Sequence, residues 1–414
     1  GVGQVWISVG LAIGYTISWL VEAPRLRRFS IVANDSITIP QYLTNRFLSK
    51  SKALQIICAV IFLVAYTVYA ASSVKACGTL FNTVTGMDET AAMYLASIII
   101  IGYTFLGGFS AVCWTDFFQG MLMLGALLIA PIFALFMLQG MGIHAVDTPD
   151  YFNAFSSWKD IVSGLGWGLG YFGMPHIIIR FMSLESQKSL KKSAKIGITW
   201  TVLIVIFAAA VGIIGRLFLG YDEAINGHSL VFITMVRKIF PGVISGLLLS
   251  AVLAASMSTA DSQLLMAASA FASDVYKPVF RKGKASDKEM MWAGRIVVLI
   301  ISVVALIIAS NPNSGTIMSL VSNAWGVFGA AFGPAIILSL FWKRFTFAGA
   351  VVSIIVGAAV DGLWLAFLSG TGIYEIIPAF AASMIAAIVA SLLSKKPGED
   401  VEELFDKAVK FEEE

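Results

Sequence analysis

The chain has 414 residues, of which 58% are hydrophobic and only 13% charged, and its mean hydropathy is +0.85. This composition excludes a soluble globular domain and predicts an integral membrane protein with many spans. The formal net charge of +3 matters less than its distribution along the chain. The few cysteines and histidines lack metal-ligand spacing, which argues against a disulfide framework and against a histidine-based metal site.

Apolar runs bounded by charged residues, Gly or Pro predict an all-α fold of about eleven transmembrane helices. We expect these runs to form a single transmembrane domain over residues 1–394, followed by a charged tail over 395–414 with helical periodicity. The predicted spans are 4–22, 53–74, 89–107, 114–138, 160–180, 195–219, 240–273, 291–310, 315–342, 346–368 and 374–394.

Basic residues gather in alternate loops between these spans. The loops after the first, fifth, seventh, ninth and eleventh spans hold most of the 28 Lys and Arg residues. Because basic loops stay in the cytoplasm, we expect a multi-pass protein of the plasma (inner) membrane with residue 1 outside and the tail inside. A short interfacial helix is expected in the first basic loop, beginning near Pro40 and capped by Asp35 or Ser36.

A cluster of hydroxyls and one acid interrupts the long apolar run 240–273. Ser256, Ser258, Asp261 and Ser262 fall near the middle of the bilayer, where polar groups are costly unless something binds them. Oxygen ligands of this kind suit a small alkali cation, so the cluster predicts an ion site. The alternative is that the hydroxyls bond back to the preceding helical turn.

The fifth predicted span carries five glycines and Pro175 within twelve residues. Such a run is a poor continuous helix, and transporters place broken helices at the bilayer midplane to meet solute and ion. Trp167 and Tyr171 are four residues apart, so they share one face and can wall an apolar, partly cationic solute. The alternative is tight glycine-mediated helix packing.

Three further residues stand out in otherwise apolar spans. Asp116 lies in the inner half of the fourth span, at the level of Asp261 and Ser262, and either shares a cation site with them or partners a helix N-terminus. Tyr69, taken alone, is typical of an interfacial aromatic belt, and Asp361 is expected at the membrane interface. Motifs of known enzyme classes are absent, so we do not expect an enzyme.

Several stretches together resemble the solute:sodium symporter family, and most closely its sodium/proline branch. The resemblance covers essentially the whole chain. The matching stretches are GGFSAVCWTDFFQ (107–119), GWGLGYFGMPHIIIRFM (166–182), LSAVLAASMSTADSQLL (249–265), SNAWGVFGAAFGP (322–334) and YEIIP (374–378).

The resemblance implies a fold of five plus five helices related as inverted repeats and sodium-coupled uptake of L-proline, with sodium as a co-transported ligand and no further cofactor. It assigns sodium ligands to the Ala255 carbonyl, Ser258 and Thr259. No nucleic acid and no obligatory protein partner is expected beside the lipid bilayer. Substrate-site positions follow from the resemblance as Trp167, Tyr171, Pro175 and Tyr69.

The resemblance also assigns a second cation site or a coupling role to Asp116, Asp261 and Ser262. An acid at position 261 departs from relatives that use two hydroxyls there, which leaves the number of sodium ions open. The first two helices usual in the family are expected to be missing, so that the chain is a fragment of a working symporter. The alternatives are sodium symport of another small solute (another amino acid, a carboxylate or a sugar), a cation channel and a transporter-like sensor.

Overall fold

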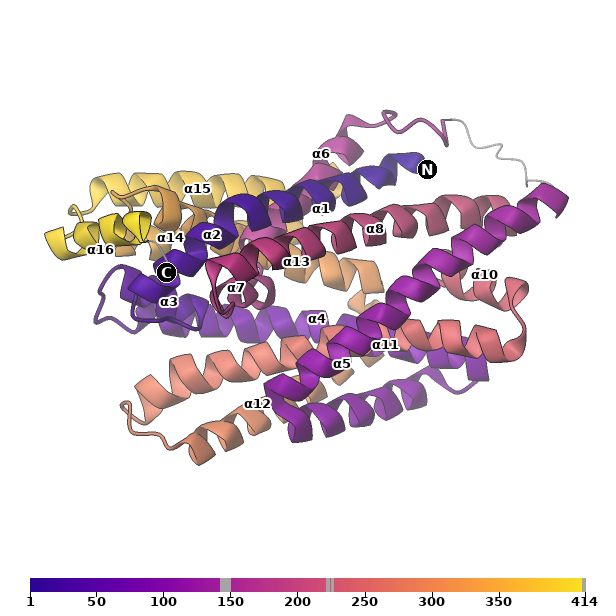
Figure 1. The fold of residues 1–414 in the computed structure, drawn as a ribbon, viewed down its shortest axis with the longest axis horizontal. Coiled ribbons are helices and arrows are strands. Elements are labelled where there is room, and N and C mark those ends of the chain that lie inside the picture. The colour runs from indigo at the N-terminus through magenta and orange to yellow at the C-terminus, as the bar shows by residue number, and fades with distance from the viewer. Residues whose placement is uncertain (142–149, 221–223, 225–226, 412–414) are drawn as a thin grey trace.

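A computed structural model describes residues 1–141, 150–220, 224 and 227–411, apart from the side chains of 103, 106–111 and 141. The expected motif 107–119 therefore lies in part outside the described side chains. The described residues are helical throughout their regular structure, and Figure 1 shows most of the long helices running along one common axis. The α-helices are α1 (Val5–Ile17), α2 (Ala23–Val32), α3 (Ile39–Arg46), α4 (Ala53–Thr85), α5 (Glu89–Met141), α6 (Trp158–Gly166), α7 (Pro175–Met182), α8 (Gln187–Leu219), α10 (Val231–Ile239), α11 (Gly242–Ala270), α12 (Asp287–Ser310), α13 (Ile317–Phe341), α14 (Phe347–Phe367), α15 (Ile376–Leu393) and α16 (Glu399–Lys410).

Within the described part of the chain, nine helical stretches are long and apolar enough to cross a membrane. Each overlaps one of the predicted spans. The remaining two predicted spans also become helical, but not as separate continuous helices. The region 160–180 is broken into α6, a 3₁₀ segment η3 (Trp167–Phe172) and α7. The region 89–107 is joined to the next span within α5.

The loop expected between 107 and 114 is helical, so α5 runs through 53 residues without interruption. A straight helix of that length would measure about 80 Å, far more than a bilayer is thick. Figure 1 shows how the ribbon accommodates this length, because α5 turns back on itself and forms two arms. The two predicted spans correspond to these arms.

The first predicted span also extends further than expected. A π-helical segment η2 (Ser18–Glu22) continues α1 into α2, which ends at Val32. The interfacial helix expected near Pro40 is present as α3, but its cap is Thr38, whose side chain accepts a hydrogen bond from the Gln41 amide. The expected caps Asp35 and Ser36 are wrong because Thr38 stands directly before the first helical turn.

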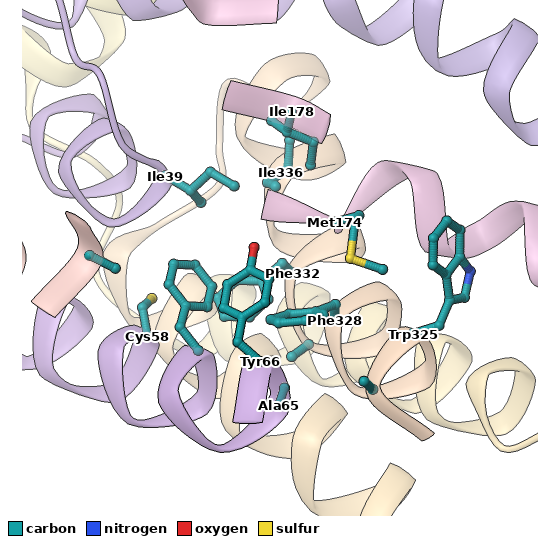
Figure 2. Packing of buried hydrophobic residues seen from close by; sticks show 14 of the residues in the cluster. Ile39, Cys58, Ala65, Tyr66, Met174, Ile178, Trp325, Phe328, Phe332 and Ile336 are labelled. Atoms are coloured by element: carbon teal, nitrogen blue, oxygen red, sulfur yellow. The ribbon is translucent and has the colours of Figure 1, made fainter. Parts of the chain in front are cut away.

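Helix α13 is the centre of the bundle. In its most apolar window 78% of the residues are buried, against at most half in the other spanning helices. Its Phe328 and Phe332 pack against Phe62 and Tyr66 of α4, and the Tyr66 and Phe328 rings lie 4.6 Å apart. Figure 2 shows this aromatic layer together with Met174 from the broken segment. The broken segment is therefore packed against the most deeply buried of the spanning helices.

The tail forms helix α16, which packs against α2. Val401, Phe405 and Ala408 face inward from it, as the amphipathic spacing requires. The guanidinium of Arg46 on α3 is fully buried beneath it and donates to the carbonyls of Ser339 and Val401. The last helix is thus part of the folded body.

Candidate functional site

The broken segment is the structural centre of the candidate site. Helix α6 passes into the 3₁₀ turn at Trp167, the backbone becomes extended at Met174, and α7 begins with Pro175 at its first position. Proline is favoured there because the first helical turn leaves its N–H groups unbonded in any case. The predicted break in the helix is therefore present.

The glycines of this segment also provide close packing, as the alternative interpretation proposed. A Cβ atom at Gly168 would meet the backbone of Gly10 and Gly14 on α1, and one at Gly170 would overlap the indole of Trp325 on α13. Both interpretations therefore describe the structure. The glycines let the non-helical turn sit directly between α1 and α13.

Trp167 lines an open pocket of about 400 Å³, a volume within the usual range for small-molecule sites. Its ring stacks on Tyr374 with the centroids 5.0 Å apart, and its carbonyl accepts a hydrogen bond of 2.9 Å from Trp325 Nε1. The pocket continues over Ser163, Ser322 and Glu375. An aromatic wall and a few polar groups therefore meet there.

Tyr171 is buried to the same extent as Trp167, with 8% of each residue's surface exposed. Tyr15 and Trp325 meet it edge-on, with ring centroids 4.9 Å and 5.1 Å away. Tyr171 does not line the open pocket. The Tyr171 ring is thus held between the rings of Tyr15 and Trp325, and both contacts have the favourable edge-to-face geometry.

Tyr69 lies in the interior, so the expectation of an interfacial belt is wrong. Helix α4 continues to Thr85, and this places Tyr69 in its middle instead of near its outer end. The Tyr69 ring lies 6.4 Å from that of His176, next to Pro175. Trp167, Tyr171 and Pro175 belong to the broken segment itself, and Tyr69 approaches it from α4.

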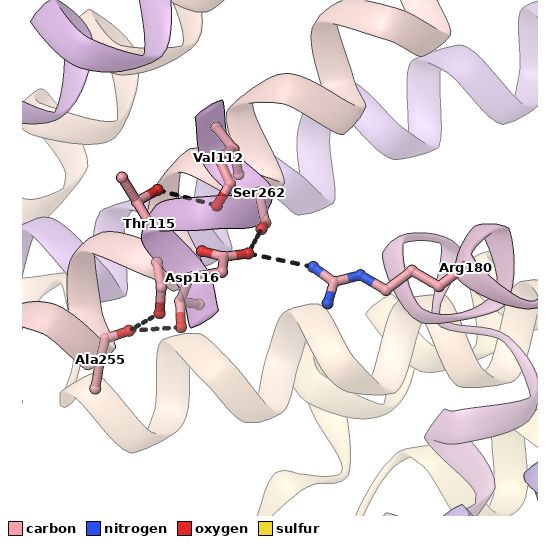
Figure 3. Close-up of polar contacts among 8 residues, drawn as sticks. Val112, Thr115, Asp116, Arg180, Ala255 and Ser262 are labelled. Atoms are coloured by element: carbon pink, nitrogen blue, oxygen red, sulfur yellow. Dashed lines mark hydrogen bonds and ion pairs between the residues drawn. The ribbon is translucent and has the colours of Figure 1, made fainter. Parts of the chain in front are cut away.

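The predicted sodium ligands share one carbonyl on α11. Ser258 Oγ and Thr259 Oγ1 both donate to the Ala255 carbonyl, at 3.1 Å and 2.8 Å, and Figure 3 shows the two bonds meeting there. This is the back-bonding of the alternative interpretation. It also gathers three oxygen atoms at one point, and each hydroxyl keeps lone pairs that can bind a cation.

Asp116 and Ser262 meet although 146 residues separate them. Ser262 Oγ donates to Asp116 Oδ2 at 3.1 Å, and Arg180 Nη2 reaches the same oxygen at 3.4 Å (Figure 3). Oδ1 of Asp116 is buried without a hydrogen-bond partner. Because α5 is continuous through this residue, Asp116 does not stand at a helix N-terminus, and that alternative is wrong.

Asp261 is fully buried next to this pair. It directly precedes Ser262 on α11. The structure therefore joins Asp116 to Ser262, and Asp261 stands beside Ser262 in the same helix. The contact of Arg180 with Asp116 was not predicted, although the sequence shows this basic residue at the end of the Gly-rich span.

Other residues of the site were not predicted either. Trp325, Tyr374 and Glu375 fall in the matching stretches 322–334 and 374–378, so the resemblance contained the signal. Asp361, expected at the interface, is instead fully buried in α14. Its position beside Gly362 offered no sign of this, because hydropathy alone does not distinguish lipid from protein surroundings.

Comparison with known proteins places this site in a family. The sodium:solute symporter family matches residues 1–357. The chain is 42% identical to the high-affinity proline transporter PutP of Bacillus subtilis (strain 168), over 98% of this chain and 87% of that protein. It is also 42% identical to a sodium/proline symporter of Staphylococcus aureus, over 97% of this chain and 81% of that one. The chain belongs to the sodium:solute symporter family, whose co-transported ion is sodium.

Solved structures agree in fold. The chain matches the substrate-bound, outward-open Na⁺-coupled sialic acid symporter with a TM-score of 0.69 and 19% identity, over 96% of this chain and 91% of that one. It matches the nucleobase-cation-symport-1 family transporter Mhp1 with a TM-score of 0.54 and 14% identity, over 97% and 89% of the two chains. The predicted architecture, that of inverted-repeat secondary transporters, is thereby confirmed.

Proposed function

We propose that this protein is a sodium-coupled secondary transporter that takes up L-proline across the plasma membrane. The observation that carries the proposal is the 42% identity, over nearly the whole chain, to proteins named for proline transport. We further propose that residue 1 lies outside the cell, that residues 1–394 form the transporter domain and that the tail 395–414 is cytoplasmic. No catalytic reaction is proposed.

Sodium would bind at the oxygens of Ala255, Ser258 and Thr259. A hard cation finds there a backbone carbonyl and two hydroxyls already gathered on one face of α11. Sodium binding would stabilise the conformation in which this face of α11 and the neighbouring helices are spaced to hold the ion. It would therefore shift the population toward the proline-binding conformation.

Proline would bind against the broken segment. Trp167 and Tyr171 offer aromatic faces to its apolar ring and to its charged amine, while Pro175 and Tyr69 close the site from α7 and α4. Asp116, Asp261 and Ser262 would serve a second cation site or couple the ion to the solute. Coupling requires that sodium and proline raise each other's affinity by the same factor.

The test is uptake of radiolabelled proline into proteoliposomes with and without an inward sodium gradient. The key variant is the double substitution Ser258→Ala/Thr259→Ala. Its matched control is Ser250→Ala, because Ser250 lies on the same helix and bonds back to the Leu247 carbonyl in the same way. Sodium-dependent uptake should be lost in the double variant and kept in the control.

Other outcomes overturn distinct parts of the proposal. Sodium-dependent currents without proline uptake would keep the ion site and reject proline as the solute, leaving symport of another small solute or a channel. Uptake that is indifferent to sodium would reject the coupling. If Ser250→Ala behaves like the double variant, the hydroxyls of α11 act only in helix packing.

A further inference from the structure

Two acidic side chains are buried where α14 and the start of α15 meet α13, and one of them, Glu375, also lines the pocket described above. Asp361, on α14, has a relative exposure of 0%, and Glu375, directly before α15, has one of 8%. Both oxygens of Asp361 and Oε1 of Glu375 are buried without a hydrogen-bond partner. Buried carboxylates are normally bonded or paired, so this arrangement requires an explanation.

The two carboxyls face the same point on α13. A Cβ atom built on Gly326 would lie 2.7 Å from Asp361 Oδ1 and 3.4 Å from Glu375 Oε1. The space that a larger residue would fill at Gly326 is therefore occupied by the two acids, which converge from α14 and from the start of α15. Two negative charges that converge on one point of the protein interior repel each other.

No positive charge in the described part of the chain neutralises the pair. Among the residues that the structure describes, neither acid takes part in an ion pair. The titratable groups that act on them from the packed helices are the two acids themselves and Tyr374, and the Tyr374 hydroxyl already donates to the Ser322 carbonyl at 2.8 Å. Two ionised, unpaired carboxylates would cost several kcal/mol, so such groups bind a proton or a metal cation instead.

We propose that Asp361 and Glu375 form a proton-binding site and share one proton between their facing oxygens at neutral pH. A single proton removes one charge and supplies the missing hydrogen bond, since a protonated carboxyl donates to the ionised one. A proton requires only the two oxygens that converge at Gly326. A sodium ion would need further oxygen ligands around the same point.

The proton site is connected to the pocket of the proposed proline site. Glu375 lines that pocket together with Trp167, and it follows directly after Tyr374, whose ring stacks on Trp167. Loss of the shared proton would add a negative charge beside the pocket and would alter the position of Tyr374. This link to transport rests on the proposed function, whereas the proton site itself does not.

Infrared spectroscopy of the purified protein in lipid tests the site directly through the C=O stretch of a buried, protonated carboxyl. We expect such a band at neutral pH and its loss in Asp361→Asn, in which the amide donates to Glu375 in place of the proton. Asp160→Asn, at a partly exposed acid of the same pocket, is the matched control and should leave the band unchanged.

A second variant and a change of ion keep the proposal falsifiable if Asp361→Asn fails to fold. Glu375→Gln should abolish the band in the same way, because its amide donates to Asp361 in place of the shared proton. A band that persists in Glu375→Gln would show that no proton is shared. A band that appears only after sodium is replaced by choline would show that the pair binds sodium, and would overturn the proposal. The results of both infrared experiments are independent of whether the protein transports proline.

Discussion

Ser262 Oγ donates a hydrogen bond to Asp116 Oδ2 at 3.1 Å and thereby joins α11, which carries the proposed sodium ligands, to α5. If this contact couples the two helices, Asp116→Asn and Ser262→Ala should not act independently. We expect each variant to weaken sodium activation of proline uptake about 10- to 100-fold, as for loss of a charge-assisted hydrogen bond.

The double variant is the informative measurement for this contact. Its effect should fall short of the sum of the two single effects by about 1 kcal/mol, the coupling expected for residues in one hydrogen-bond network. Sodium half-saturation in proteoliposomes gives these values for all three variants. Fully additive effects would show that the contact does not transmit sodium binding.

A second prediction concerns the closest contact of the broken segment. Gly170→Ala would place a Cβ atom against the indole of Trp325, whose Nε1 donates to the Trp167 carbonyl. The indole must move and the hydrogen bond must break, so we expect a loss of about 2–4 kcal/mol in stability together with loss of proline uptake. Thermal unfolding in detergent and uptake measure the two effects.

The control for this variant is Gly246→Ala on α11, where an added methyl group meets nothing within 4 Å. A helical Gly→Ala change in open space should be neutral or stabilise by about 0.5–1 kcal/mol. Equal melting temperatures of Gly170→Ala and the wild type would mean that the turn tolerates displacement of Trp325.

Arg46 provides a third prediction, about the tail. It donates to the carbonyls of Ser339 and Val401, and its guanidinium lies 4.9 Å from the centroid of the Phe405 ring. Arg46→Ala leaves both carbonyls buried without this donor, at about 1–3 kcal/mol each. We expect α16 to detach and the tail to become sensitive to trypsin at Lys407.

Glu403→Gln is the control for this experiment. It breaks only the exposed ion pair between Glu403 and Lys407, which contributes little to stability. Its tail should resist trypsin as the wild type does. Protection that persists in Arg46→Ala would mean that the apolar face of α16 holds the helix in place without the arginine.

The sequence predicted the membrane-spanning segments well because hydropathy measures how long an apolar run is, and every predicted span except the broken 160–180 corresponds to continuous helix in the structure. It predicted the break at 160–180 because glycine and proline act on the backbone locally. It did not predict the burial of Tyr69 and Asp361, since apolar residues face lipid as readily as protein in a membrane and leave no periodic signal for the buried face.

Contacts between distant segments were also beyond the sequence. The level of Asp116 in the bilayer suggested that it lies near Ser262, but Arg180 as the third member depends on how α7 leaves the broken segment. The convergence of Asp361 and Glu375 on Gly326 depends on the packing of three helices. Neither arrangement follows from spacing along the chain.

The last prediction concerns alkaline pH and Tyr42, which lies on α3 outside the spanning helices. Its side chain is fully buried, its hydroxyl lies 3.0 Å from Ser339 Oγ, and burial raises its pKa from 10.0 to about 12. Because the Ser339 hydroxyl already donates to the Ile336 carbonyl, the Tyr42 hydroxyl is the donor of this bond. The folded protein therefore holds this proton more tightly than the unfolded chain does.

The sign of the effect follows from that difference. The Tyr42 hydroxyl contributes its full stabilisation of the folded protein below pH 10, where the folded and the unfolded protein both keep the proton. As the pH rises from 10 through about 12, the free energy of unfolding falls by about 3 kcal/mol in total. In Tyr42→Phe this loss should be absent, at the expense of about 1 kcal/mol at lower pH for the missing hydrogen bond. Chemical unfolding between pH 8 and pH 12, compared as wild type minus variant, measures it. The control is Tyr94→Phe, at a tyrosine that is 54% exposed, and its plot of unfolding free energy against pH should run parallel to that of the wild type. A Tyr42→Phe plot that also runs parallel to the wild type would show that Tyr42 does not control alkaline stability.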